Sequence, residues 1–400
     1  MQKKKILVLG NQLSGHNNPI FEIMGSFLSM NYEIDFCITD DFKERVSKFP
    51  CNFIFYPSEV LTIFRGIISE QKEMKNLNDD RFLNARYAFE MQAAITKVIV
   101  PWALKTLKPE DYKFVIYSSF SIWSNCLALH WKLPEINSTA SFKVPKFLFN
   151  QLEDEETKVL IDDFNKEYGT KWTTVTDMLS CDNAERIILY TSEYFHYHNE
   201  KIPLEKIFFT PRQKETKFFL GRKKMEPGSL IYFSLGTVFN RDTKLLRNGM
   251  HTLGKFKQYK VLYSFGKAKD LYEEIKKENV YPNIEMVEWA DQQKILQETC
   301  LFISHAGFSS VREAAQSATP MILVPQCVDQ PDVAFRVAEL GAGLMIKKHD
   351  RKEDDLEKAI LQIEGNYDSF VDGVIKIQDS YKKSLDGEGL VKAIEEYLKI

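Results

Sequence analysis

Short apolar runs alternate with longer segments of helical periodicity along most of the chain. The runs are rich in β-branched and aromatic residues and predict strands at residues 6–10, 33–39, 52–55, 114–117, 186–190, 230–235, 260–264, 301–304 and 321–324. A long helical pattern covers residues 80–107, and the chain ends in helices. This alternation is typical of parallel, doubly wound α/β sheets, and it occurs twice.

The stretch from residue 201 to residue 228 separates the two alternations. It contains Pro203, Pro211 and Pro227 among many charged residues, as interdomain linkers often do. A chain of 400 residues is long enough for two domains with separate cores. We predict a first domain over residues 1–212, a linker over 213–228 and a second domain over 229–400, with the last helix packing back on the first domain.

Composition and charge narrow the class of protein. The hydrophobic fraction of 44% and the charged fraction of 27% are ordinary for a globular protein. A formal charge of -3 gives no reason to expect nucleic acid as a partner. The two short basic runs, at residues 3–5 and 222–224, are predicted to be solvated ends or linkers.

The cysteines and the apolar runs bear on location. The six cysteines show no C-x-x-C or metal-finger spacing, which favours free thiols in a reducing compartment. No run reaches the roughly 18 apolar residues of a membrane helix, and residues 6–10 are too short for a signal-peptide core. We therefore expect a cytoplasmic protein without membrane insertion.

Polar residues cluster after two predicted strands of the second half. Residues 308–317 read as the helix that follows the strand at 301–304, and residues 321–325 read as the next strand. Ligands bind outside the carboxyl ends of parallel strands, so His305 and the loop at 326–330 are expected on one rim. Amides at the start of the helix, with His305, Ser309 and Ser310, offer donors for a diphosphate.

The segment from Trp289 to Gln330 resembles the donor-binding signature of family 1 glycosyltransferases, the UDP-glycosyltransferases of the GT-B fold. The resemblance implies two Rossmann-like domains that face a cleft, with the acceptor in the first and the donor mostly in the second. It also implies specific contacts with a UDP-sugar: Trp289 on the uracil, Gln292 and Glu313 near the ribose, His305 on the phosphates within a turn containing Gly307, Ser309 and Ser310, and Asp329 with Gln330 on the sugar hydroxyls.

This chain departs from the family pattern in the same segment. The usual turn, His-Cys/Gly-Gly-x-Asn-Ser, becomes His305-Ala306-Gly307-Phe308-Ser309-Ser310 and loses a phosphate-facing Asn. Asp291 stands where Pro is common. The resemblance at Asp329 and Gln330 implies UDP-glucose as the favoured donor.

A second turn in the same half resembles the S-x-G-T motif near the donor phosphates of this family. It reads Ser234-Leu235-Gly236-Thr237 and closes the first predicted strand of the half. Asn240 continues the form found in bacterial macrolide-type members. Gly236 and Thr237 are therefore expected at the donor.

The candidate base lies near the start of the chain. Gly15-His16-Asn17-Asn18-Pro19 resembles the G-H-x-N-P turn of the family and precedes a helix expected near Ile20. An imidazole with an ordinary pKa of about 6.5 is largely neutral yet basic at cytosolic pH. The resemblance implies that His16 removes the acceptor proton in a single displacement that inverts the anomeric configuration.

The family orients this His with an Asp at the end of a later strand. Here the matching run begins Val115-Ile116-Tyr117-Ser118, so that Ser118 occupies the place of the Asp. A hydroxyl fixes a tautomer but does not offset the charge of an imidazolium. Three outcomes stay open: an acidic acceptor such as a phenol needs little help, another carboxylate reaches His16, or the protein is a weak or inactive homologue.

Metal and cofactor sites are not expected. His196 and His198 lack matching Cys or Glu spacing, and the chain has no Asp-x-Asp motif of metal-dependent glycosyltransferases. The favoured function is transfer of a sugar from a UDP-sugar to a small, largely apolar acceptor such as a macrolide, a flavonoid or another natural product. The alternatives are a non-catalytic nucleotide-binding homologue or partner protein and, less favoured, a sugar-nucleotide epimerase.

Overall fold

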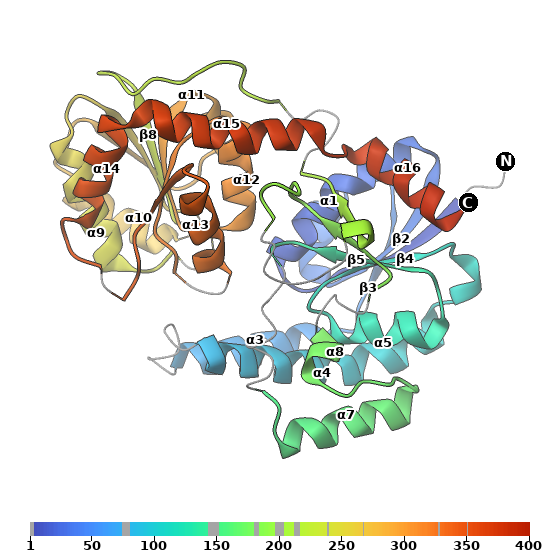
Figure 1. Cartoon of the computed structure of the whole chain (residues 1–400). Helices are drawn as coiled ribbons and strands as arrows, with labels where there is room; N and C mark the ends of the chain where they lie inside the picture. The colour runs from blue at the N-terminus through green and yellow to red at the C-terminus, as the bar shows by residue number, and fades with distance from the viewer. Residues whose placement is uncertain are drawn as a thin grey trace. The chain divides into compact units, whose positions relative to one another are not determined.

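The chain divides into two compact units, each built on one parallel sheet (Figure 1). The computed structural model describes residues 4–73, 81–142, 152–179, 184–196, 204–211, 217–237, 240–266, 268–326, 329–349 and 351–400. Unit 1 comprises Met1–Thr191, His198–Lys214 and Ser384–Ile400, and unit 2 comprises Ser192–Tyr197 and Glu215–Lys383.

Within the described residues, unit 1 contains a seven-stranded parallel sheet of order β3-β2-β1-β4-β5-β6-β7. Its strands are β1 (Lys4–Leu9), β2 (Tyr32–Ile38), β3 (Asn52–Phe55), β4 (Val115–Ser118), β5 (Glu135–Thr139), β6 (Arg186–Leu189) and β7 (Ile207–Phe209). Its helices are α1 (Ser14–Ser29), α2 (Lys43–Val46), α3 (Glu59–Glu73), α4 (Arg81–Thr106), α5 (Ile122–Trp131), α7 (Glu155–Tyr168), α8 (Val175–Leu179) and α16 (Gly387–Leu398), with short 3₁₀ turns at Asp40–Phe42, Pro109–Asp111 and Leu204–Lys206.

The central strand β1 is buried on both faces of the sheet. Leu7 and Leu9 belong to the core under α4 and α5, whereas Ile6 and Val8 belong to the core under α1. Successive side chains of a strand point to opposite faces, so a strand covered on both sides needs an uninterrupted apolar run. This requirement explains the sequence I-L-V-L at residues 6–9.

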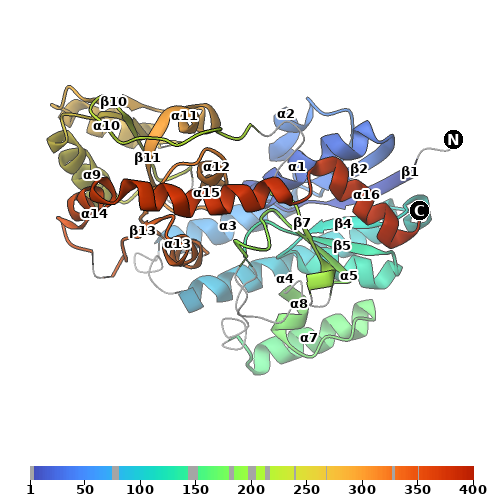
Figure 2. The same cartoon turned by 45° about the horizontal axis from the view of Figure 1, so that its top comes forward.

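The last helix, α16, packs on unit 1 beside α1 (Figures 1 and 2). Leu390, Val391 and Ile394 are buried in the core under α1. Glu395 accepts hydrogen bonds from Lys4 Nζ at 2.6 Å and from the Tyr32 hydroxyl at 2.9 Å. These contacts join the end of the chain to its first two strands.

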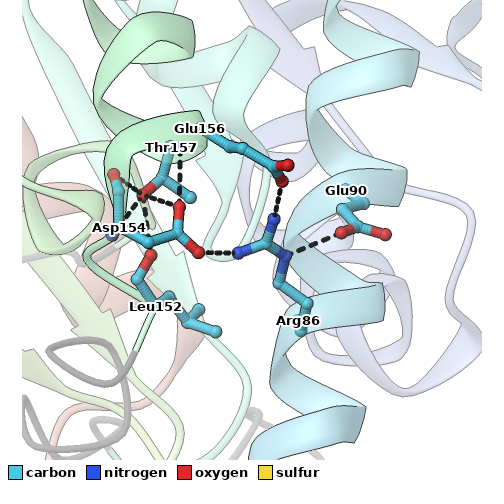
Figure 3. A network of polar contacts seen from close by, with 6 residues as sticks. All are labelled: Arg86, Glu90, Leu152, Asp154, Glu156 and Thr157. Atoms are coloured by element: carbon cyan, nitrogen blue, oxygen red, sulfur yellow. Dashed lines mark hydrogen bonds and ion pairs between the residues drawn. The ribbon is translucent and has the colours of Figure 1, made fainter.

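A charged network joins α4 to the start of α7 (Figure 3). The guanidinium of Arg86 donates to Glu90 at 2.7 Å, to Glu156 at 2.8 Å and to Asp154. Asp154 also caps α7, because its side chain accepts the backbone N–H of Thr157 and Thr157 returns a bond to the backbone of Asp154. One guanidinium thus fixes a helix N-terminus against its neighbour.

Within its described residues, unit 2 contains a six-stranded parallel sheet of order β10-β9-β8-β11-β12-β13. Its strands are β8 (Leu230–Ser234), β9 (Lys260–Ser264), β10 (Ile284–Val287), β11 (Thr299–Ser304), β12 (Met321–Leu323) and β13 (Gly343–Met345). Its helices are α9 (Thr243–Lys255), α10 (Lys269–Glu278), α11 (Gln292–Glu298), α12 (Phe308–Gln316), α13 (Gln330–Glu339), α14 (Asp355–Gly365) and α15 (Tyr367–Lys383).

The two sheets confirm the predicted fold class of two Rossmann-like parallel-sheet units. All nine predicted strands are present, with ends that agree with the prediction to within two residues. Strands β5, β7, β10 and β13 were not predicted, and β7 lies in the stretch at residues 201–228 that was interpreted as an interdomain linker. The first helix begins at Ser14 and not near Ile20, so Pro19 lies inside it.

The segment at residues 217–228 also differs from the prediction, because it packs on unit 2. The Phe219 N–H donates to the Gln316 carbonyl at 3.1 Å, and Gln378 donates to the Phe219 carbonyl at 3.0 Å. Lys223, expected in a solvated basic run, is 7% exposed. Its ammonium donates to the Thr319 hydroxyl at 2.7 Å, to the Thr299 carbonyl at 2.8 Å and to the Leu296 carbonyl.

Other expectations concern membranes, metals and thiols. No helix in the described part of the chain is long and apolar enough to cross a membrane. The described residues contain no cluster of three or more potential metal ligands. His196 is buried, and His198 lies outside the described residues. Free thiols are present at Cys37, Cys51, Cys126 and Cys300, whereas Cys181 and Cys327 lie outside the described residues.

Candidate active site

Each sheet reverses its strand order at one point, and the candidate site residues gather there. In unit 1 the reversal lies between β1 and β4, and in unit 2 it lies between β8 and β11. A parallel sheet opens a crevice at the carboxyl ends of such strands, where ligands bind. In unit 1, His16 follows β1 and Ser118 is the last residue of β4. In unit 2, Gly236 follows β8 and His305 follows β11.

In unit 1, His16 lies in the first turn of α1, held by a compact loop. The Asn17 side chain accepts the Asn11 N–H at 3.0 Å and donates to the Asn11 carbonyl at 2.5 Å. Gly10 allows this approach, since a Cβ there would lie 2.9 Å from Asn17 Oδ1 and 2.6 Å from the Phe36 ring. Asn17 is fully buried, so its paired amide fixes the direction of the helix start.

The imidazole of His16 faces the end of β4. Its Nδ1 is 3.4 Å from Ser118 Oγ, and its ring centroid is 6.5 Å from that of Phe120. The Ser118 hydroxyl lies 3.2 Å from the Ser119 carbonyl, to which it donates. Burial lowers the pKa of His16 to about 4, and the Ser119 backbone acts in the opposite direction. The imidazole is therefore neutral at physiological pH.

Two further side chains near this loop were not singled out by the sequence. Gln12 donates to Met91 Sδ at 3.8 Å and is almost fully buried, as is Gln92 on α4. The side-chain amide oxygen of Gln12 and both polar atoms of the Gln92 side-chain amide have no hydrogen-bond partner among the described residues. Buried amides in this condition commonly meet a water molecule or a ligand.

In unit 2, the imidazole of His305 lies between two glycine backbones. A Cβ on Gly236 would come within 2.7 Å of the ring, and a Cβ on Gly307 would come within 2.4 Å of Nε2. Gly236 also has a φ of +78°, which favours glycine. Burial lowers the pKa of His305 to about 4, so this imidazole is also neutral at physiological pH.

The side chain of Asn240 holds the Gly236 turn in place. Its amide donates to the Gly236 carbonyl at 3.0 Å and to the Phe265 carbonyl at 2.7 Å. A Cβ on Gly266 would lie 2.4 Å from the Gly236 carbonyl oxygen, so the two turns approach closely. The exposed Thr237 follows at the carboxyl end of the sheet.

Helices α11 and α12 are joined by the polar residues expected near a ribose. Gln292 donates to Glu313 Oε2 at 2.7 Å and to the Ser310 hydroxyl at 3.1 Å. Asp291, which departs from the family pattern, caps α11 by accepting the Lys294 N–H at 3.3 Å. Just before this helix, the Trp289 side chain is 67% exposed, which is unusual for so large an apolar group.

Asp329 and Gln330 lie at the start of α13. Asp329 is the N-cap residue, and Gln330 begins the helix. The Gln330 amide oxygen accepts the Gln326 N–H at 2.8 Å, which joins Gln326 to the start of α13. Both residues follow β12, the parallel neighbour of β11. They therefore belong to the same edge of the sheet as the residues that follow β8 and β11.

Comparisons with known proteins show what this architecture is similar to. Residues 238–370 match the model of the glycosyltransferase family 28 C-terminal domain. The chain is 24% identical over 412 residues to the uncharacterized UDP-glucosyltransferase YdhE of Bacillus subtilis, and the match covers 99% of both chains. Among solved structures, the glycosyltransferase of kitacinnamycin superposes with a TM-score of 0.81 at 15% identity, covering 100% of both chains. The calicheamicin glycosyltransferase CalG4 superposes with a TM-score of 0.79 at 19% identity, covering 100% of this chain and 99% of the other.

The chain is a glycosyltransferase of the GT-B fold, similar to family 1 enzymes. In this glycosyltransferase, unit 1 brings His16 and Ser118 together, and unit 2 brings together Gly236, His305 and Gly307. A second group in unit 2 consists of Gln292, Ser310 and Glu313. Thr237, Trp289, Ser309, Asp329 and Gln330 lie on the turns and helix starts that follow the strands of unit 2.

Proposed function

We propose that this glycosyltransferase moves a sugar, most simply glucose, from a UDP-sugar to a hydroxyl of a small, largely apolar acceptor. The observation that carries the proposal is the nesting of His305 between Gly236 and Gly307 at the reversal point of the second sheet. The name UDP-glucosyltransferase of the Bacillus relative supports the donor. The two solved glycosyltransferases are named for the natural products kitacinnamycin and calicheamicin, which supports the acceptor class.

The donor side of the proposal uses groups of unit 2. The first amides of α12 and the His305 imidazole would bind the diphosphate, because a helix N-terminus attracts an anion. Glu313, oriented by Gln292, would accept hydrogen bonds from the ribose hydroxyls, and the exposed face of Trp289 would stack on the uracil. Protein donors then neutralise the diphosphate, and we propose that neither a metal ion nor another cofactor is required.

The chemical step is a single displacement assisted by His16. Ser118 faces Nδ1, which leaves Nε2 to take the acceptor proton as the acceptor oxygen attacks the anomeric carbon. The new C–O bond forms as the bond from the anomeric carbon to the diphosphate oxygen breaks, so UDP leaves and the configuration inverts. His305 and the amides of α12 would stabilise the charge that grows on the diphosphate.

The test combines an activity assay with a binding assay. The enzyme is incubated with UDP-glucose and a panel of phenols and alcohols, and the masses of the products are measured by mass spectrometry. We expect a mass gain of one hexose in wild type and a loss of transfer of at least ~100-fold in His16→Ala, since a positioned base contributes ~10²–10⁴-fold. UDP affinity should be unchanged in His16→Ala, because His16 is assigned no donor contact.

The matched control is His130→Ala, because His130 is an exposed histidine of unit 1. Its transfer rate should equal that of wild type. An unchanged rate in His16→Ala would remove His16 from the mechanism. UDP binding without transfer to any acceptor would favour the second candidate, a non-catalytic nucleotide-binding homologue, which the absence of an Asp at position 118 motivates.

A further inference from the structure

No carboxylate is recorded in contact with the His16 imidazole within the described residues of unit 1. Among the described residues of unit 1, the groups that interact with the ring are the Ser118 hydroxyl, the Ser119 backbone and the Phe120 ring. None of these is a carboxylate. Ser118 itself is fully buried at the end of β4, so its hydroxyl is a fixed part of the site.

The hydrogen bonds of Ser118 define what it does for the imidazole. Its Oγ lies 3.2 Å from the Ser119 carbonyl, which can only accept, so the hydroxyl proton is directed there. The oxygen lone pairs then face Nδ1 of His16 at 3.4 Å. Ser118 therefore favours the tautomer with the proton on Nδ1 and leaves Nε2 as the base. It orients the ring without offsetting a positive charge.

Two other features disfavour a positively charged His16. The ring lies in the first turn of α1, where the helix dipole places positive potential. It is also largely withdrawn from water, which lowers its pKa to about 4. An imidazolium formed during the reaction would therefore meet burial, a helix N-terminus and a neutral hydroxyl.

We propose that this site glycosylates acceptors whose reacting group is already acidic, of the phenol, enol or thiol class, and discriminates against aliphatic alcohols because Ser118 is neutral. The inference rests on the proposed function and specifies its acceptor. An acidic acceptor carries most of its own charge at the transition state, so less positive charge develops on His16. An aliphatic alcohol needs almost complete proton transfer to a base that the site does not stabilise.

The size of the expected discrimination follows from acceptor acidity. A phenol has a pKa of about 10, as in tyrosine, whereas an aliphatic hydroxyl resembles water, whose pKa is about 15.7. Proton transfer to the same base is thus less favourable by ~10⁵–10⁶-fold for the alcohol. Removal of the Asp partner of a catalytic His in a serine protease costs ~10⁴-fold in turnover, which shows how much a carboxylate contributes.

The experiment compares matched acceptors with wild-type enzyme and UDP-glucose. The pair 2-naphthol and 2-naphthylmethanol has similar size and hydrophobicity but differs in acidity, and a set of ring-substituted naphthols extends the range. We expect kcat/KM to be at least ~100-fold higher for the phenol, a conservative share of the acidity difference. A thiol, 2-naphthalenethiol, should also be glycosylated.

Substitution of Ser118 tests its role as a positioning residue. Ser118→Asp should raise kcat/KM for 2-naphthylmethanol by at least ~10-fold more than for 2-naphthol, since a carboxylate stabilises the imidazolium. Ser118→Asn introduces a neutral side chain of about the size of Asp. This variant should keep the preference for the phenol over the alcohol. A merely structural role would change both acceptors by the same factor in both variants.

The outcomes separate this inference from the proposed function. Equal kcat/KM for the phenol and the alcohol with wild type would overturn the acceptor inference and leave the glycosyltransferase activity intact. Bound UDP without transfer to any acceptor would overturn both. If Ser118→Asp does not fold, the wild-type comparison of the naphthol pair alone decides.

Discussion

His305 shows how strongly a single side chain in this protein depends on the backbone around it. We predict that Gly236→Ala lowers UDP affinity by at least ~10-fold, about 1.4 kcal/mol. The added Cβ would lie 2.7 Å from the His305 ring, which Gly307 also confines, so the imidazole has to move. Isothermal titration with UDP measures the effect.

The matched control for this prediction is Gly341→Ala. Gly341 has a φ of +65°, close to the +78° of Gly236, but a Cβ there would meet nothing within 4 Å. Both variants carry the backbone strain of a left-handed residue, ~1–2 kcal/mol, and only Gly236→Ala displaces His305. Equal UDP affinity in the two variants would show that His305 does not need its present position.

At the scale of elements, Lys223 anchors the segment before β8 to the sheet of unit 2. We predict that Lys223→Met destabilises the protein by ~2–3 kcal/mol, since the buried acceptors of the ammonium, at Leu296, Thr299 and Thr319, lose their donor. The neighbouring Lys224 is exposed, so Lys224→Met should change stability by less than ~0.5 kcal/mol. Urea unfolding measures both, and similar losses in the two variants would contradict the anchoring role.

The pH dependence of this stability has a definite sign. Burial lowers the pKa of Lys223 to about 7, below the ordinary value of 10.5 for an exposed lysine. Between these values the unfolded chain binds the proton more tightly than the folded chain, so stability rises with pH across the window. The stability difference between wild type and Lys223→Met should therefore increase from pH 7 to pH 9.5.

Helices and strands could be predicted from the sequence where a local pattern of apolar residues determines them. They could not be predicted where burial depends on neighbouring elements of the fold. The apolar run at residues 6–9 identified β1, whereas β5 reads E-I-N-S-T and its polar residues are buried only because β4 and β6 flank it. Strands β7 and β13 have three residues each, too few for a periodic signal, whereas β12 of the same length was predicted because its apolar run continues to Val324. Lys223 looked solvated because a charge run does not reveal three acceptors that lie more than 70 residues away in the sequence.

The same division applies to the candidate site. The position of Ser118 opposite His16 could be predicted, because parallel neighbours β1 and β4 end at the same edge. The lowered pKa values of His16 and His305 could not, because they depend on burial by side chains from several elements. The predicted start of α1, near Ile20, was wrong by about a turn and a half. Proline is common at the first position of a helix, but Pro19 lies within this one.

At the scale of the whole molecule, unit 1 is built from segments that are far apart in the sequence. Its core contains side chains from the first strands and from residues 384–400. Residues 384–400 belong to unit 1, although the preceding helix α15 belongs to unit 2. Leu390, Val391 and Ile394 on α16 are fully buried in the same core as Ile6 and Val8. Unit 1 is thus complete only when both ends of the chain are present.

Removal of residues 384–400 should therefore destabilise unit 1 selectively. Three fully buried aliphatic side chains contribute ~5 kcal/mol or more, at ~1.5–3 kcal/mol each, which is a large share of a domain stability of ~5–15 kcal/mol. Hydrogen exchange with mass spectrometry should show lost protection in α1 and β2, with β8 and β11 of unit 2 still protected. Glu395→Gln is the milder comparison, because it weakens the bonds to Lys4 and Tyr32 and leaves the apolar contacts in place. It should cost ~1 kcal/mol, and equal loss of protection in both units after truncation would mean that α16 stabilises the protein as one cooperative body.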